Sequence, residues 1–177
     1  MNKLTKVISG IWVFCFFSVP AISQNVAVID TQAAILQTQV AQDAFKALEE
    51  ETEYSSMVEE AKELQAKRQN MVEKLQKDAE ALSNEEIAEL QKDIQENGQD
   101  LEFILGKIQA KQNETVQSVA TELNPQMMKI INDLIISKKI QILLGADQVL
   151  FSDSSVSITE QVTDALDGAA SAESQSD

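Results

Sequence analysis

Apolar residues divide the chain into a long helical stretch set between short β-type segments. Residues 26–29 form an apolar run rich in β-branched side chains, which is typical of a strand. Residues 31–82 carry apolar side chains at helical spacing, and a second helical pattern follows them. Residues 140–144 and 148–151 are again short apolar runs, so we predict two further strands there, joined by a turn at residues 145–147.

Heptad spacing occurs in both helical segments and predicts contact between helices of the coiled-coil type. The first seam, diluted by polar members, consists of Val58, Ala61, Gln65, Arg68, Val72, Leu75, Ala79 and Leu82. The second seam consists of Ile87, Leu90, Ile94, Leu101, Ile104 and Ile108. Between the seams, Ser83 and Glu86 fit the S-x-x-E capping box that starts a helix. The pattern therefore predicts an antiparallel hairpin, an arm on the order of 60 Å long.

The second helix contains other residues that could allow a turn or a bend. Asn97-Gly98 has a β-turn signature, but the heptad runs through it, so it ranks second to Ser83. A helical Gly98 costs only about 1 kcal/mol relative to Ala, and with Gly106 it would make the arm bendable. Pro125 removes a backbone hydrogen bond and favours a kink or a fresh helix start, with Asn124 as a plausible cap.

The hydrophobic pattern also predicts which end of the hairpin is buried. Apolar residues become dense from Met127 onward, so the returning end of the hairpin should pack against the strands. Residues 157–166 are predicted as a short amphipathic helix, and the small, polar residues 168–177 as a disordered tail. Three short strands bury too little surface for an independently stable sheet, and their open edges need a partner.

We therefore expect a mainly α protein with a small β body, a projecting helical hairpin and several associated copies. The predicted parts are a signal peptide at residues 1–23, a body at residues 24–42 and 126–167, a helical-hairpin arm at residues 43–125 and an acidic tail at residues 168–177. The residues predicted to join the copies through the body are Val26, Val28, Ile142, Leu144, Val149 and Phe151. The pattern leaves the number of copies open.

The first residues have the features of an export signal. Lys3 and Lys6 supply positive charge before an apolar run at residues 7–19, and Ala21-Ile22-Ser23 places small residues where cleavage is determined. We expect cleavage after Ser23. An uncleaved membrane anchor is the alternative, although the run is shorter than the roughly 20 residues that a spanning helix needs.

Composition excludes several kinds of chemistry for the chain after residue 23. The single Cys of the sequence lies in the predicted signal, and the sequence has no His, so zinc sites of the usual Cys/His type and His-dependent triads are excluded for the chain that follows. No Gly-rich phosphate motif is present. The formal net charge of the full sequence is −15, which disfavours binding to nucleic acid or anionic lipid. We expect no cofactor, no metal and no enzyme activity.

The order of the segments resembles one known family. The sequence V-A-V-I-D at residues 26–30 precedes the long charged hairpin, and I-Q-I-L-L at 140–144, V-L-F-S-D at 149–153 and S-I-T-E-Q-V at 157–162 follow it. This arrangement resembles the Skp (OmpH-like) periplasmic chaperones over about residues 25–166. The resemblance implies a periplasmic homotrimer with a β-barrel-like body and three arms around a cavity. It also implies an ATP-independent holdase for unfolded outer membrane proteins.

The charge of the chain departs from that of the familiar members of the family, which are basic. Lipopolysaccharide contact has been proposed for a basic cluster in those members, and we do not carry it over to this acidic chain. A coiled-coil envelope scaffold or spacer without chaperone activity is the alternative function. Such a protein would show the same heptads, but it should be longer and lack the terminal strands.

The arm residues expected to contact an unfolded client are apolar, and two are methionines, whose flexible thioethers adapt to irregular surfaces. They are Met57, Val58, Leu64, Met71, Leu101, Phe103 and Ile108. For most of them the simpler interpretation is that they hold the two arm helices together. Met57 and Phe103 fall outside the seams and are therefore the stronger candidates.

Overall fold

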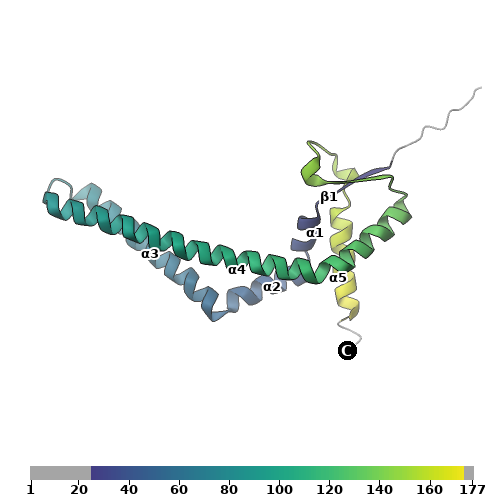
Figure 1. The fold of residues 1–177 in the computed structure, drawn as a ribbon, viewed down its shortest axis with the longest axis horizontal. Helices are drawn as coiled ribbons and strands as arrows, with labels where there is room; N and C mark the ends of the chain where they lie inside the picture. Colours follow the sequence, from purple (N-terminus) through teal and green to yellow (C-terminus); the bar gives the residue numbers. More distant parts are fainter. Residues whose placement is uncertain (1–24, 174–177) are drawn as a thin grey trace, which may run out of the picture.

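The computed structural model describes residues 25–173 of the chain and shows a compact body from which one long arm projects (Figure 1). The elements, in order, are β1 (Val26–Ile29), α1 (Thr31–Leu36), α2 (Gln39–Glu50), α3 (Thr52–Lys77), α4 (Asn84–Lys138), β2 (Ile142–Gly145), the 3-10 helices η1 (Ala146–Gln148) and η2 (Ser154–Val156), and α5 (Thr159–Glu173). The prediction of a mainly helical chain with a small β body is confirmed. The predicted export signal, with its cleavage after Ser23, lies outside the described residues.

The sheet joins the two ends of the described chain. β1 and β2 pair in parallel, with Val26 opposite Ile142. Along the other edge of β1, the backbone N–H of Ile158 donates to the carbonyl of Val28 at 2.9 Å, and Val28 forms a bridge with Ser157. β1 is thus paired on both sides, whereas the outer edge of β2 has no strand partner within residues 25–173.

The prediction of a single helix over residues 31–82 is wrong, because two breaks divide this segment into α1, α2 and α3. The first break is at Thr38, whose side chain accepts a hydrogen bond from the N–H of Ala41 at 3.2 Å and donates one to the carbonyl of Ile35 at 2.7 Å. Thr38 is buried, so its hydroxyl satisfies backbone groups that water cannot reach.

The second break is at Glu51, which has extended backbone angles and separates α2 from α3. The chain turns sharply there, as Figure 1 shows, and we call this point the elbow. The Lys111 ammonium on α4 lies 3.6 Å from the carboxylate of Glu51 and 3.8 Å from that of Glu53. Beside it, the Gln112 amide donates to the Tyr54 hydroxyl at 2.8 Å. These contacts attach the elbow to α4.

α3 and α4 run antiparallel along the arm. α3 ends at Lys77, five residues before the predicted end of the helix at Leu82, and a turn leads from there to α4. The predicted helix start is confirmed: Ser83 caps α4, and the side chain of Glu86 accepts a hydrogen bond from the Ser83 N–H at 2.8 Å. Gly98 lies inside α4, so the alternative turn at Asn97-Gly98 is wrong.

α4 continues through Pro125, so the predicted fresh helix start there is wrong. A proline inside a helix removes one backbone hydrogen bond and bends the axis. Pro125 lines a cavity together with Leu166 of α5, and Figure 1 shows α4 changing direction where it passes α5. The helix ends at Lys138, and the next residue, Lys139, adopts a left-handed conformation with φ of 54°.

The segment after β2 differs from the prediction in two ways. Residues 148–151 form no strand: η1 takes in Gln148, and Leu150 and Phe151 are exposed. An isolated β-type run cannot form a ladder without a neighbouring strand, and none lies beside it in the described chain. The last helix is longer than expected, because α5 extends to Glu173 and takes up part of the predicted tail.

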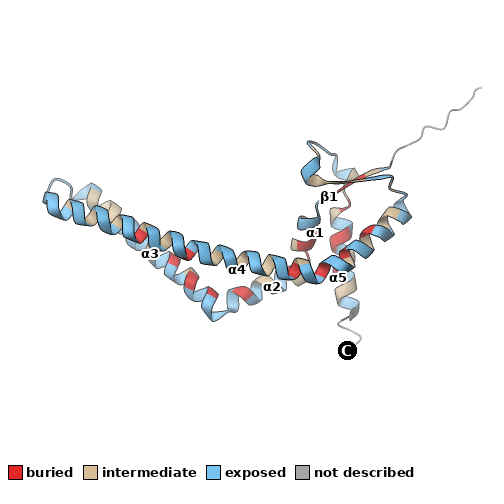
Figure 2. Cartoon of the chain, viewed as in Figure 1, coloured by how far each residue is buried: buried red, intermediate tan, exposed pale blue. Residues whose placement is uncertain are grey.

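Two separate apolar cores hold the chain together (Figure 2). The body core joins β1, α1, α2, α5 and the body end of α4, and its buried members are Ala27, Ile29, Ala34, Ile35, Ala41, Val119, Leu123, Met127, Ile131, Ile158, Val162 and Leu166. The arm core consists of Leu48, Tyr54, Met57, Ala61 and Ile104, with Phe45, Val58, Leu64, Leu101 and Ile108 packed against them. Its members lie in the half of the arm nearer the body.

Candidate functional site

Most of the predicted client-contact residues belong to the arm core. Met57 is buried there, and Val58, Leu64, Leu101 and Ile108 are half-buried against the same cluster. Their apolar surface is largely used between α2, α3 and α4, as the simpler interpretation of the heptads requires. The expectation that Met57 is one of the two stronger candidates is wrong, because only 8% of it is exposed.

Phe103 is the candidate whose side chain is available to a partner. It is 63% exposed on α4, and the ammonium of Lys107 lies 4.8 Å from the centre of its ring. Met71, the remaining candidate, is half-buried outside the arm core. Leu105, which the sequence reasoning missed, is 50% exposed. Like Phe103 it is apolar and lies off the heptad seam, and this signal could have identified it.

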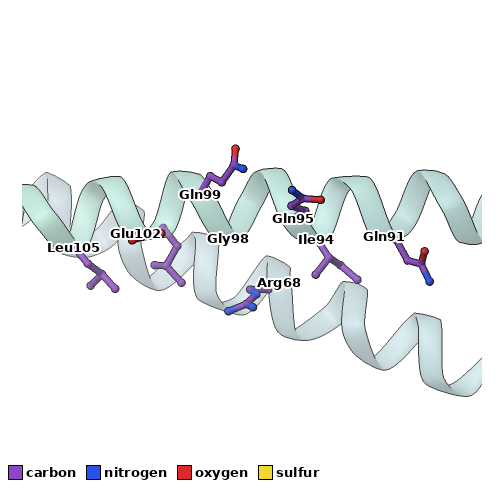
Figure 3. A pocket seen from close by; sticks show the side chains of 9 residues that line it. Arg68, Gln91, Ile94, Gln95, Gly98, Gln99, Glu102 and Leu105 are labelled. Carbon is purple, nitrogen blue, oxygen red and sulfur yellow. The ribbon is translucent and has the colours of Figure 1, made fainter.

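A groove runs along the arm, from the level of Ile104 in the arm core towards the tip. It is lined by Arg68 of α3 and by Gln91, Ile94, Gln95, Gly98, Gln99, Leu101, Glu102 and Leu105 of α4. Figure 3 shows Arg68 beside the α4 ribbon, with Ile94 and Leu105 pointing to the same side of α4 and Gln99 pointing to the other. The lining combines apolar, amide and charged groups. These groups can hold a polypeptide segment but supply no nucleophile paired with a base.

A buried polar side chain lies on α4 at the level of this groove. Asn97 is only 4% exposed, and both polar atoms of its side chain lack a hydrogen-bond partner among the described residues. An unsatisfied buried amide costs about 1–3 kcal/mol, so this part of the arm is held together less firmly than the arm core.

The body exposes a second apolar surface. Of the residues predicted to join copies, Phe151 is 86% and Ile142 43% exposed. Val26, Leu144 and Val149 are half-buried, whereas Val28 is buried within its own body between β2 and Ser157. Val28 is therefore not on the surface of a single chain, and its assignment to the oligomerisation body stays a prediction. Sequence reasoning missed three exposed apolar residues of the body region: Leu150, Ile136 and Met128.

Two carboxylates on the arm accept hydrogen bonds from residues close to them in the sequence. A hydrogen bond from Gln69 lowers the pKa of Glu73, and hydrogen bonds from the backbone and then the side chain of Ser83 lower the pKa of Glu86. In both cases the hydrogen bond stabilises the ionised carboxylate. Within residues 25–173, no three His, Cys, Asp or Glu side chains are close enough together to hold a metal ion. None of the helices described has the length and hydropathy that a membrane crossing requires.

Comparison with known proteins places the chain in a family. A family model described as "Outer membrane protein (OmpH-like)" matches residues 25–166. The fold is similar to a crystal structure of a candidate OmpH-like outer membrane chaperone from Caulobacter crescentus CB15, with 16% identity, coverage of 82% of this chain and 85% of that chain, and a TM-score of 0.46. The comparison with curated proteins gives no match. Because the family model spans most of the sequence, the chain belongs to the OmpH-like (Skp) family of chaperones.

Proposed function

We propose that this chain is an ATP-independent periplasmic holdase that keeps unfolded outer membrane proteins from aggregating by holding them between the arms of a homotrimer. The observation that carries this proposal is the arm itself. Its apolar core occupies only the half nearer the body, and Phe103 and Leu105 stay 63% and 50% exposed on α4. Family membership supports a chaperone but does not by itself identify the client.

Weak apolar contacts suit a holdase that uses no nucleotide. Burying apolar surface is worth about 25 cal/mol per Å², so one exposed phenylalanine or leucine contributes only a modest, reversible affinity. Several arms acting on one chain raise the overall avidity without demanding a particular client sequence. The net charge of −15 keeps a chain with such exposed groups soluble.

The exposed apolar groups of the body support the association of copies that the proposal requires. Leu150 and Phe151 are exposed on the segment that follows β2, whose outer edge has no strand partner within residues 25–173. An unpaired strand edge next to exposed apolar side chains favours pairing with another chain. Copies joined there would carry their arms around a shared space. We do not extend the proposal to lipopolysaccharide, because the chain is acidic.

Suppression of aggregation tests the proposed function. An unfolded β-barrel membrane protein is diluted from urea with and without a near-stoichiometric amount of the assembled protein, and light scattering is followed. The protein should keep scattering low without ATP. Replacing both exposed residues, in the variant Phe103→Ser/Leu105→Ser, should weaken suppression severalfold, whereas Gln117→Ser at an exposed polar position of α4 should not. A wild-type protein that leaves scattering unchanged would instead fit an envelope scaffold or spacer.

A further inference from the structure

Beyond the arm core, the arm has a single buried side chain, and it is polar. We call residues 65–100 the distal arm, which takes in the end of α3, the turn and the first part of α4. Its large apolar side chains are half-buried at best, and they are Met71, Val72, Leu75, Leu82, Ile87, Leu90 and Ile94. The one buried residue in this range is Asn97 (Figure 2). The distal arm therefore has no apolar core of its own.

Asn97 occupies a position between the helices that an apolar residue would otherwise fill. It lies between Ile94 and Leu101 in the heptad. A Cβ on the next residue, Gly98, would lie 3.8 Å from the Arg68 side chain, so α3 faces α4 at this level. Neither polar atom of the Asn97 amide has a hydrogen-bond partner among the described residues. When the helices part, water supplies these hydrogen bonds, so this residue favours their separation.

The side-chain polar contacts of the distal arm all lie within one helix or at its cap. Lys77 donates to Glu73 at 3.2 Å within α3, and Lys92 pairs with Glu96 at 3.3 Å within α4. Across residues 65–100, no side-chain hydrogen bond or ion pair joins α3 to α4. At the elbow, by contrast, such contacts do join the two helices. Separation of the distal helices therefore breaks no polar contact between them.

Opposite charge keeps the two helices of the distal arm near each other. Residues 65–77 of α3 include four basic residues and one acidic residue, whereas residues 84–100 of α4 include six acidic residues and one basic residue. Attraction between charges that are not in contact acts through water and weakens as salt screens it. It favours the closed distal arm but does not seal it as an apolar core would.

We propose that α3 and α4 separate at Asn97 over the distal arm while the arm core stays closed, and that the opened surface between them binds apolar segments of an unfolded client. This inference rests on the proposed function and adds a second binding surface inside each arm. Few buried apolar contacts are the physical mark of a segment that opens locally. The half-buried apolar side chains of the distal arm become available to the client in the open state.

The open surface is continuous with the exposed part of the arm. Ile94 and Leu101, which lie on the heptad seam, line one groove with the exposed Leu105. Figure 3 shows Ile94 and Leu105 pointing to the same side of α4. A client segment that contacts Leu105 therefore lies at the edge of the seam. Unfolded membrane β-strands carry apolar side chains at alternate positions, and the open seam offers them a longer apolar row.

Hydrogen exchange followed by mass spectrometry tests the opening in the assembled protein. Separated helices of this length are only marginally stable in water, so their amides exchange when the arm opens. Asn97→Leu keeps the branching of the side chain and removes the unsatisfied amide. It should slow exchange in residues 65–100 severalfold and leave the arm core unchanged. High salt should speed exchange in the distal arm of the wild type. If Asn97→Leu exchanges as fast as the wild type, the arm does not open at Asn97.

A second substitution and a control separate closure of the arm from general stability. Asn97→Ala also removes the amide but adds no volume, so it should slow distal exchange even if leucine does not fit. Gly106→Ala lies on the same helix, and a Cβ there would contact nothing within 4 Å. It should raise the thermal midpoint, because alanine favours helix, and leave distal exchange unchanged. In the aggregation assay, both Asn97 variants should suppress scattering severalfold less well than Gly106→Ala.

A single thiol on the seam reports contact with the client. The chain after residue 23 has no Cys, so Leu90→Cys places one thiol at a half-buried seam position. Its alkylation by iodoacetamide should become severalfold slower when Asn97→Leu is added and also when the urea-unfolded β-barrel protein is bound. Glu89→Cys, at an exposed position one residue away, should react equally fast with and without Asn97→Leu. If bound client leaves the Leu90→Cys rate unchanged, the client does not occupy the seam.

The outcomes distinguish failure of this inference from failure of the proposed function. If the wild type suppresses aggregation and both Asn97 variants suppress it equally well, the inference is wrong and the holdase proposal stands. If Asn97→Leu changes the mass of the assembly, Asn97 acts in association of the copies and the inference also fails. If the wild type suppresses no aggregation, the proposed function fails, and the client-binding part of this inference fails with it.

Discussion

Met57 and Phe103 are large apolar side chains of the same arm with different physical roles. Met57 is buried in the arm core, whereas Phe103 stands 63% exposed beneath Lys107. We expect Met57→Ala to destabilise the protein by about 2 kcal/mol or more through the cavity it leaves. Phe103→Ala should lower the free energy of unfolding by less than about 1 kcal/mol. Urea unfolding followed by circular dichroism measures both, and equal losses would show that Phe103 is a packing residue.

The capping box at Ser83 makes the start of α4 sensitive to acid. Glu86 has a pKa below the ordinary 4.5, because Ser83 hydrogen bonds stabilise its charged form. Its contribution to stability is therefore fully present above pH 4.5 and is lost as the pH falls through the lowered folded pKa. Glu86→Gln should lower the thermal midpoint at pH 7, and its difference from the wild type should shrink towards pH 3.

The neighbouring carboxylate supplies the control for this pH dependence. Glu85 also lies in the first turn of α4, but no capping hydrogen bond joins it to Ser83 in the described chain. Glu85→Gln should lower the midpoint less than Glu86→Gln at pH 7. If the difference in thermal midpoint between Glu86→Gln and the wild type stays constant from pH 7 to pH 3, ionisation of Glu86 does not stabilise the start of α4.

Among the elements, the elbow between α2 and α3 depends on contacts with α4. Lys111 lies within 4 Å of both Glu51 and Glu53, and all three side chains are partly exposed. Such pairs contribute less than about 1 kcal/mol each and weaken with salt. We expect Lys111→Gln to leave overall stability nearly unchanged while it broadens the distribution of distances between spin labels on α3 and α5, measured by pulsed electron spin resonance.

Salt and a second ion pair complete this test of the elbow. High salt should broaden the wild-type distribution towards that of the Lys111→Gln variant, because screening weakens the same contact. Lys92→Gln breaks an exposed ion pair with Glu96 within α4 and should leave the distances unchanged. If the distance distribution is as narrow in Lys111→Gln as in the wild type, the contact between Tyr54 and Gln112 holds the elbow without the ion pairs.

At the scale of the whole molecule, the exposed apolar pair after β2 predicts association. Leu150 and Phe151 contribute little to the fold of their own chain, since both are exposed. Replacing both with Asp should therefore reduce the mass in sedimentation equilibrium to that of a monomer while the far-ultraviolet circular dichroism stays unchanged. Phe103→Asp, an exposed residue on the arm, should keep the oligomeric mass. An unchanged mass for the double variant would place the contact between copies elsewhere.

Features that depend on a few neighbouring residues were predictable from the sequence. The strand at residues 26–29, the helix start after Ser83 and the two long helices follow from local spacing and capping chemistry, and the structure has them. The breaks at Thr38 and Glu51 were not predictable in this way. Thr38 lacks the Glu or Gln three residues later that marks a capping box, and Glu51 is a good helix former. Packing against α4 and α5 determines both positions.

The sequence by itself determined that the chain is helical, acidic and built as an arm with β-type ends, because helical periodicity, capping and charge are properties of short segments. Only the tertiary structure decided which apolar residues are buried. Met57 and Phe103 both lie off the heptad seams, yet one packs between helices and the other faces solvent, since the elbow at Glu51 sets which face of α3 meets α4. The groove at Gly98 likewise required α3, because Arg68 forms its wall only when the two helices lie side by side.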